Sequence, residues 1–216
     1  MRSADERDEV WGPDDTRARC LGHRGPTPAR PATTAGLTAM AIERCEECGF
    51  DPSDVAPDAE SVADAVRAFA RRYRMPLTRG LAGEDLDAVV RVRPSPDVWS
   101  ALEYAAHARD IFRVFDDRVR GAVEGRQPAE RVVDWEGRVA AASPSLDREA
   151  VAADVADAAD TLAATFTGVE SEHWRLPAVT GRGREETLLD LAAIVVHEGG
   201  HHLLDIGRSL RAARGR

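Results

Sequence analysis

The sequence predicts an all-α protein, a four-helix bundle with a long crossover connection, and three observations support this prediction. Apolar residues recur every three or four positions over four long segments, the period of an amphipathic helix. No segment alternates apolar and polar residues over the length of a strand. The connection over residues 125–143 is longer than most, which suits a bundle without simple up-and-down order.

The first helix is expected over residues 58–73, with an apolar stripe of Val62, Val66, Phe69 and Tyr73. Pro76 is expected to end this helix, because proline lacks an amide hydrogen and clashes with the preceding turn. The short valine-rich run 89–92 is followed closely by two prolines, so we expect a loop there.

The second helix is expected over residues 96–123, with Ser95 as its N-cap and Pro96 in its first turn. Its apolar residues occupy more than one face, so it should lie centrally. The third helix is expected over residues 146–166 and the fourth over 185–213.

Composition limits the kinds of partner. The chain has 216 residues, 43% hydrophobic and 31% charged, which is typical of a globular protein. A net charge of -9 argues against nucleic acid, since an acidic surface repels phosphates. The absence of a long apolar run or an apolar leader favours a cytoplasmic protein without a membrane partner. All 29 basic residues are arginine, a bias typical of a high-GC genome.

Three regions follow from composition. Residues 1–40 are rich in proline and polar residues, so we expect a disordered N-terminal extension. Residues 41–56 form a short segment around a CxxC motif. Residues 57–213 hold the four helical segments and should form the bundle.

Histidines in two of the expected helices suggest a metal site. His197 and His201 are four residues apart, so a helix places both imidazoles on one face, one turn apart. His107 lies midway along the second helix on an apolar background. Imidazole is a common ligand of zinc, and three histidines leave a fourth position open, as in catalytic sites.

Carboxylates flank these histidines. Glu103, Asp110 and Asp205 are candidates to accept a hydrogen bond from the second nitrogen of a metal-bound histidine. His202 is expected to point away from the His197 and His201 face and to serve in packing.

Other interpretations of the histidines stay open. A buried histidine is often a hydrogen-bonded core residue. The segment HEGGH also matches the H-E-x-x-H pattern of metal-dependent hydrolases, in which Glu198 would act as general base. Gly199 and Gly200 interrupt this helix, which indicates close packing or room for a ligand.

The cysteines offer a second motif. Cys45 and Cys48 have the spacing of half a zinc site, for which Cys20 and His23 would be a complement in the N-terminal extension. A redox pair, or two free thiols in a turn that packs Phe50 against the bundle, are the alternatives. An odd cysteine count with a CxxC motif favours a reducing compartment.

Two motifs resemble a known family. The segment WSALEYAAHARDIF at 99–112, followed by VHEGGHHLLDIGR at 196–208, resembles the DinB/YfiT-like superfamily, which includes the N-terminal domain of mycothiol-dependent maleylpyruvate isomerase. The resemblance spans residues 57–213. It implies a four-helix bundle with a long crossover and a divalent metal on His107, His197 and His201.

The resemblance also implies a function. The metal, with zinc expected first and nickel or manganese as alternatives, would activate a low-molecular-weight thiol such as mycothiol for transfer or isomerisation of an electrophilic substrate. Arg109 or Arg208 would pair with an anionic group of either molecule. A metal-dependent hydrolase and a non-catalytic metal-binding or stress module are the rival hypotheses. A homodimer is one expected assembly, because such bundles often pair through helix faces.

Overall fold

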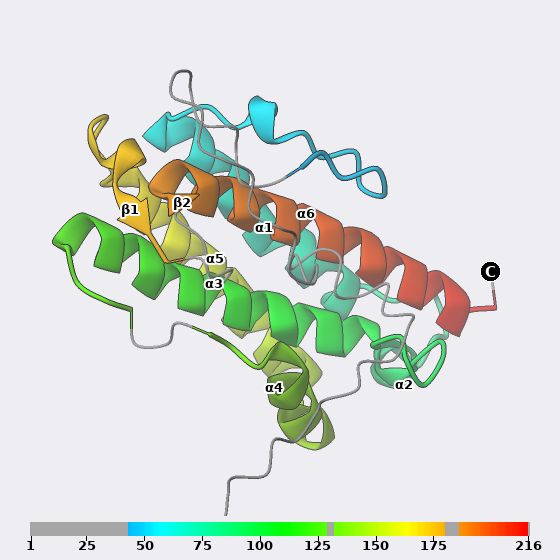
Figure 1. Cartoon of the computed structure of the whole chain (residues 1–216). Helices are drawn as coiled ribbons and strands as arrows, with labels where there is room; N and C mark the ends of the chain where they lie inside the picture. The colour runs from blue at the N-terminus through cyan, green and yellow to red at the C-terminus, as the bar shows by residue number, and fades with distance from the viewer. Residues whose placement is uncertain (1–42, 129–131, 180–185, 216) are drawn as a thin grey trace, which may run out of the picture. The chain divides into compact units, whose positions relative to one another are not determined.

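The computed structural model describes residues 43–128, 132–179 and 186–215, and four long helices make up more than half of these residues. All of these residues lie in one compact unit, Thr38–Arg216. The expected all-α class and bundle are confirmed (Figure 1). The long helices are α1 (Ala59–Thr78), α3 (Ala101–Glu124), α5 (Arg148–Thr167) and α6 (Leu188–Ala213).

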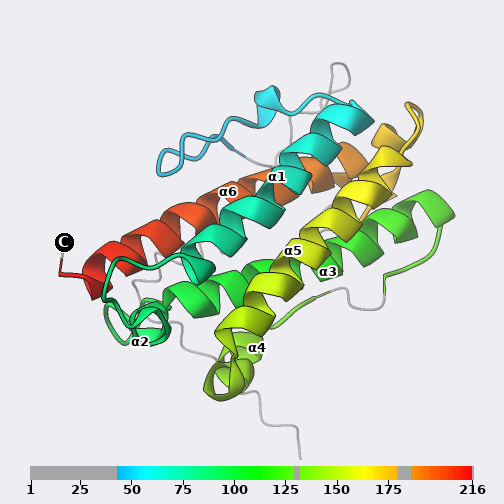
Figure 2. The same cartoon turned by 180° about the vertical axis from the view of Figure 1, so that it is seen from behind.

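The bundle closes around one apolar core. Helix α1 packs against α5 and α6, and α3 packs against the same two helices (Figures 1 and 2). The largest fully buried side chains come from all four helices and include Tyr73, Phe112, Phe166 and Ile206. Burying side chains of this size supplies the main driving force for folding.

Shorter elements connect the long helices. Helix α2 (Leu86–Arg91) follows α1, and the connection after α3 carries α4 (Trp135–Ala142). Three single 3-10 turns lie at Pro52–Asp54, Ser143–Ser145 and His173–Arg175. Two short antiparallel strands, β1 (Pro177–Ala178) and β2 (Glu186–Thr187), pair just before α6.

Two expected boundaries of the long helices are wrong. Helix α1 continues through Pro76 to Thr78, so the proline is accommodated in the last turn instead of ending the helix. Helix α3 starts at Ala101 because Ser100 and Glu103 form a reciprocal capping box. Ser95 instead pairs with Val98 in an isolated bridge.

Most of the valine-rich run that we expected to be a loop, residues 89–91, is part of α2. Asp85 caps this helix by accepting a hydrogen bond from the amide of Ala88. The first proline after the run, Pro94, comes late enough to leave one and a half turns of helix intact.

Close approach of α1 and α6 explains one of the two adjacent glycines. A Cβ atom on Gly199 would lie 2.4 Å from Cε2 of Phe69. The hydroxyl of Tyr73 donates a hydrogen bond of 2.8 Å to the carbonyl of Gly199. A Cβ atom on Gly200 would meet nothing within 4 Å. The first glycine therefore lets α1 approach the turn of α6 that carries the histidine pair.

None of the helices in the described ranges combines the length and apolar character needed to cross a bilayer. The N-terminal extension expected over residues 1–40 lies outside the described residues.

Candidate metal centre

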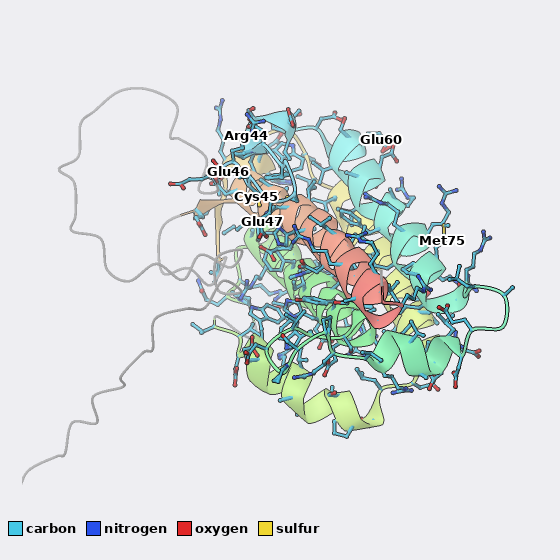
Figure 3. All side chains as sticks on the ribbon, turned by 90° about the vertical axis from the view of Figure 1, so that its right-hand side faces the viewer. Arg44, Cys45, Glu46, Glu47, Glu60 and Met75 are labelled. Atoms are coloured by element: carbon cyan, nitrogen blue, oxygen red, sulfur yellow. The ribbon has the colours of Figure 1, made fainter. Side chains whose placement is uncertain are left out.

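A tight turn presents both cysteines of the CxxC motif. The amide of Cys45 donates a hydrogen bond of 2.9 Å to the carbonyl of Phe50, and the amide of Gly49 donates one of the same length to the carbonyl of Cys45. Gly49 has a φ of +77°, which residues with a side chain rarely adopt. We call residues 45–50 the cysteine loop; Figure 3 labels Cys45 and its exposed neighbours Glu46 and Glu47.

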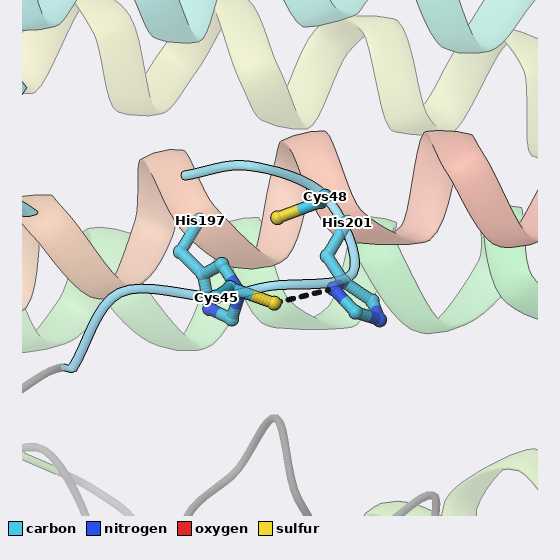
Figure 4. A group of neighbouring side chains, drawn as sticks. All are labelled: Cys45, Cys48, His197 and His201. Atoms are coloured by element: carbon cyan, nitrogen blue, oxygen red, sulfur yellow. Dashed lines mark hydrogen bonds between the residues drawn. The ribbon is translucent and has the colours of Figure 1, made fainter. Parts of the chain in front are cut away.

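The cysteine loop lies over the histidine pair of α6. Ligand atoms of Cys45, Cys48, His197 and His201 all lie within 4.8 Å of one another. The Sγ atom of Cys45 is 3.6 Å from Nδ1 of His201 (Figure 4). The structure thus joins two half-sites that are about 150 positions apart in the chain.

The histidines of this group are buried and the cysteines half-buried. His197 is 3% exposed, and neither of its ring nitrogens makes a hydrogen bond of good geometry. The ring of Phe50 covers it, with 5.1 Å between ring centroids. A buried imidazole without a well-formed hydrogen bond is costly, and a metal ligand role would satisfy it.

The donor set fits zinc. Two thiolates and two imidazoles with C-x2-C and H-x3-H spacing are a common zinc ligand set. Tetrahedral zinc with its usual bond lengths separates a sulfur from a nitrogen ligand by about 3.5 Å. The 3.6 Å between Cys45 and His201 matches this separation. This pair therefore already has the spacing of two ligands of a tetrahedral ion.

The two thiols differ in acidity. Burial opposes ionisation of Cys45, but the nearby backbone amide of Cys48 and imidazole of His197 outweigh it, so its pKa is lowered. Burial raises the pKa of Cys48 to about 11, with a further contribution from the neighbouring Cys45. The loop thus favours one thiolate, and a bound cation would stabilise the second.

Carboxylates lie beside the histidines. Oε1 of Glu198 is 3.4 Å from Nδ1 of His197, and Oε2 is 3.4 Å from Nε2 of His202. Burial opposes the charge on Glu198, but these two imidazoles hold its pKa below the usual range. Burial likewise opposes the charge on His202, yet Asp205 and Glu198 raise its pKa to about 9.

Comparison with known proteins gives one match. The family model of the DinB superfamily matches residues 70–206. The chain belongs to the DinB superfamily. No curated protein and no solved structure matches the chain. The matched span of this DinB protein includes the histidine pair but begins after the cysteine loop.

The third histidine of the expected triad lies elsewhere in this DinB protein. His107 is buried in α3, and its ring lies 4.8 Å from that of His202. Trp99 and Trp135 pack against His107 at 5.0 and 5.2 Å between centroids. His107 is not part of the four-residue group. Burial, followed by the charge of His202, lowers its pKa.

The carboxylates that were expected to accept a hydrogen bond from a metal-bound histidine separate into two groups. Asp205 adjoins the site, with Oδ2 3.7 Å from Nε2 of His201 and 3.1 Å from Nδ1 of His202. His202, which we expected to serve in packing, makes the shorter of these two contacts with Asp205. Glu103 instead caps α3 and binds Arg93.

Asp110 and both candidate anion-binding arginines form ion pairs in this DinB protein. Arg109 lies 2.8 Å from Asp110, and Arg208 lies 3.4 Å from Asp205. Nη1 of Arg208 is also 3.8 Å from Glu47 in the cysteine loop. These carboxylates compensate the charges that were expected to meet an anionic ligand.

Each half of the candidate metal centre can be recognised in the sequence, but the two halves were not paired with each other there. The signal was present, because C-x2-C and H-x3-H are complementary halves of a zinc site. Cys20 and His23, proposed as the complement of the cysteines, lie outside the described residues.

Proposed function

We propose that this DinB protein binds one divalent metal ion, zinc before nickel or manganese, on Cys45, Cys48, His197 and His201. The observation that supports it is the convergence of four soft donors, two thiols and two imidazoles, within 4.8 Å. Thiolates favour zinc over harder cations, which prefer oxygen ligands.

We propose that the bound ion would cross-link the cysteine loop to α6. The cysteine loop contacts the bundle through few apolar side chains, among them the partly buried Phe50. Ligands from the loop and from α6 would tie the two segments together, and metal binding would stabilise the fold by mass action. When bound, the ion supplies positive charge that keeps both thiols deprotonated.

A thiol-dependent transferase or isomerase is the finer function that the family resemblance suggests. That chemistry needs a metal position that a thiol such as mycothiol can reach. Four protein donors fill a tetrahedral ion, so an external thiolate would have to displace one of them. The geometry therefore favours a closed, stabilising site, and thiol transfer ranks second.

Hydrolysis has less support. Glu198, the candidate base, is fully buried and lies between two imidazoles. A general base must reach the proton that it removes, directly or through one water molecule. The placement of Glu198 favours a role in holding the histidines.

Metal analysis of the purified full chain tests the proposal. Variants Cys45→Ser and Cys48→Ser should lose bound zinc and lose the thiolate-to-metal absorption of the cobalt-loaded protein. The matched control is His107→Gln, which should retain one equivalent of zinc. Zinc retained by both cysteine variants and lost from His107→Gln would overturn the proposal in favour of the three-histidine site.

The same cobalt-loaded protein tests thiol transfer. A closed site keeps its absorption spectrum when a small thiol is added in excess. A new thiolate-to-cobalt band would contradict the closed site and favour the transferase.

A further inference from the structure

Helix α6 carries a second pair of polar residues beside the metal ligands. Glu198 and His202 are also four residues apart, one position after His197 and His201. One position rotates a helical side chain by about 100°, and the ring of His202 lies 4.8 Å from that of His107 in α3. Glu198 is fully buried.

Contacts of this second pair reach both histidine ligands. Glu198 lies 3.4 Å from His197 through one oxygen and 3.4 Å from His202 through the other. His202 lies 3.1 Å from Asp205, whose Oδ2 is 3.7 Å from Nε2 of His201. A chain of side chains thus runs from one ligand to the other behind the site.

The contacts also indicate which ring nitrogen of each histidine would bind the ion. Glu198 faces Nδ1 of His197, which leaves Nε2 for a metal. Cys45 faces Nδ1 of His201, while Asp205 and Glu47 lie near Nε2, the latter at 3.2 Å. Each imidazole therefore has one nitrogen beside a carboxylate and the other available to the ion.

The buried carboxylate of Glu198 needs an interaction that compensates for its loss of water. Neither oxygen of its carboxylate makes a hydrogen bond of good geometry. Burying a carboxylate that has no well-formed hydrogen bond is strongly unfavourable. A proton held on Nδ1 of His197 by metal binding at Nε2 would give Glu198 the donor that it lacks.

We propose that Glu198 is a positioning residue for the metal centre. It holds the ring of His197 in the tautomer protonated at Nδ1 and directs Nε2 to the ion. His202 anchors the second oxygen of Glu198 and is itself held by Asp205. This inference rests on the proposed four-ligand site. Mutation of a carboxylate in this role typically lowers metal affinity by about 10- to 100-fold.

Zinc competition with a chromophoric chelator tests the proposal. Glu198→Gln should weaken zinc binding by about 10- to 100-fold, because an amide is a poorer acceptor for the Nδ1 proton. The matched control is Glu103→Gln, which removes another buried carboxylate and destabilises α3 away from the site. Glu103→Gln should bind zinc as the wild type does. Equal loss in both variants, or none in Glu198→Gln, would overturn the positioning role.

A measurement on the unmodified chain does not depend on how the variants fold. Long-range proton–nitrogen NMR of the zinc-loaded protein reports which nitrogen of His197 carries the proton. We expect Nδ1, and a proton on Nε2 would refute the inference. Failure of the four-ligand site is a separate outcome, because it appears as zinc retention in Cys45→Ser whatever Glu198→Gln does.

Discussion

Alanine substitution of the two adjacent glycines of α6 should have opposite effects. Both Gly199 and Gly200 lie inside the helix, where alanine is favoured over glycine by about 0.5–1 kcal/mol. Their surroundings differ. A Cβ atom on Gly199 would lie 2.4, 2.6 and 2.8 Å from three ring atoms of Phe69, whereas one on Gly200 would meet no atom within 4 Å.

The ring of Phe69 has little freedom to move away. It is 2% exposed, stacks on Phe112 at 5.7 Å and meets the edge of Tyr73 at 6.1 Å between centroids. Forcing a methyl group into such packing costs about 1–3 kcal/mol. Three contacts below van der Waals distance place Gly199→Ala at the upper end, about 3 kcal/mol before the gain in helix propensity.

Denaturant unfolding of the two variants, both loaded with zinc or both free of it, measures the difference in their free energies of unfolding. Gly200→Ala should be more stable than the wild type by about 0.5–1 kcal/mol. Because the propensity gain is common to both variants, the gap between them reports the steric cost alone. We expect about 3 kcal/mol, or roughly 6–12 °C in melting temperature for a chain of this size.

A second substitution separates the steric explanation from others. Combining Gly199→Ala with Phe69→Leu should recover part of the loss, because the smaller side chain removes the clashing ring atoms. If the gap between the two alanine variants were below about 1 kcal/mol, or Gly199→Ala were the more stable, α1 and α6 would not be in the close contact described.

Three further predictions concern single groups. Burial opposes the charge on Glu103, but Arg93 and Ser143 help to hold its pKa at about 2. The ionised carboxylate therefore stabilises the fold above pH 4.5, and this stabilisation is lost as the pH falls toward 2. Glu103→Gln should therefore lower the free energy of unfolding by roughly 2–3 kcal/mol at pH 7 and flatten its decline in that acid range, as measured by urea melts across pH. Tyr73→Phe should cost about 1 kcal/mol by removing its hydrogen bond to Gly199, and an unchanged urea midpoint would contradict this. A strong chelator should lower the melting temperature of the wild type but not that of Cys48→Ser, and equal shifts would argue against the four-ligand site.

Local patterns were enough to predict the bundle. The third helix, expected over 146–166, is found at Arg148–Thr167, because its apolar stripe and the Asp147 cap act within a few turns. Helix boundaries were less predictable where caps compete. Ser95 and Ser100 both precede apolar helical sequence, and only the capping box with Glu103 decides between them.

The histidine pair of α6 also follows from the sequence alone, since helix geometry brings residues four apart onto one face. The partner of that pair does not. The cysteine loop and His107 were both chemically suitable, and their separation along the chain said nothing about which would reach His197. The outcome depends on the path of the loop over α6 and on the side of α6 that faces α3.

The sequence by itself therefore determined the four long helices, the family and the two half-sites of the candidate metal centre. Only the tertiary structure decided that the cysteines meet His197 and His201, while His202, which contacts Glu198, lies beside His107. The physical reason is one of range. Helical periodicity comes from backbone geometry over a few residues, whereas the pairing of groups about 150 positions apart depends on how whole helices pack.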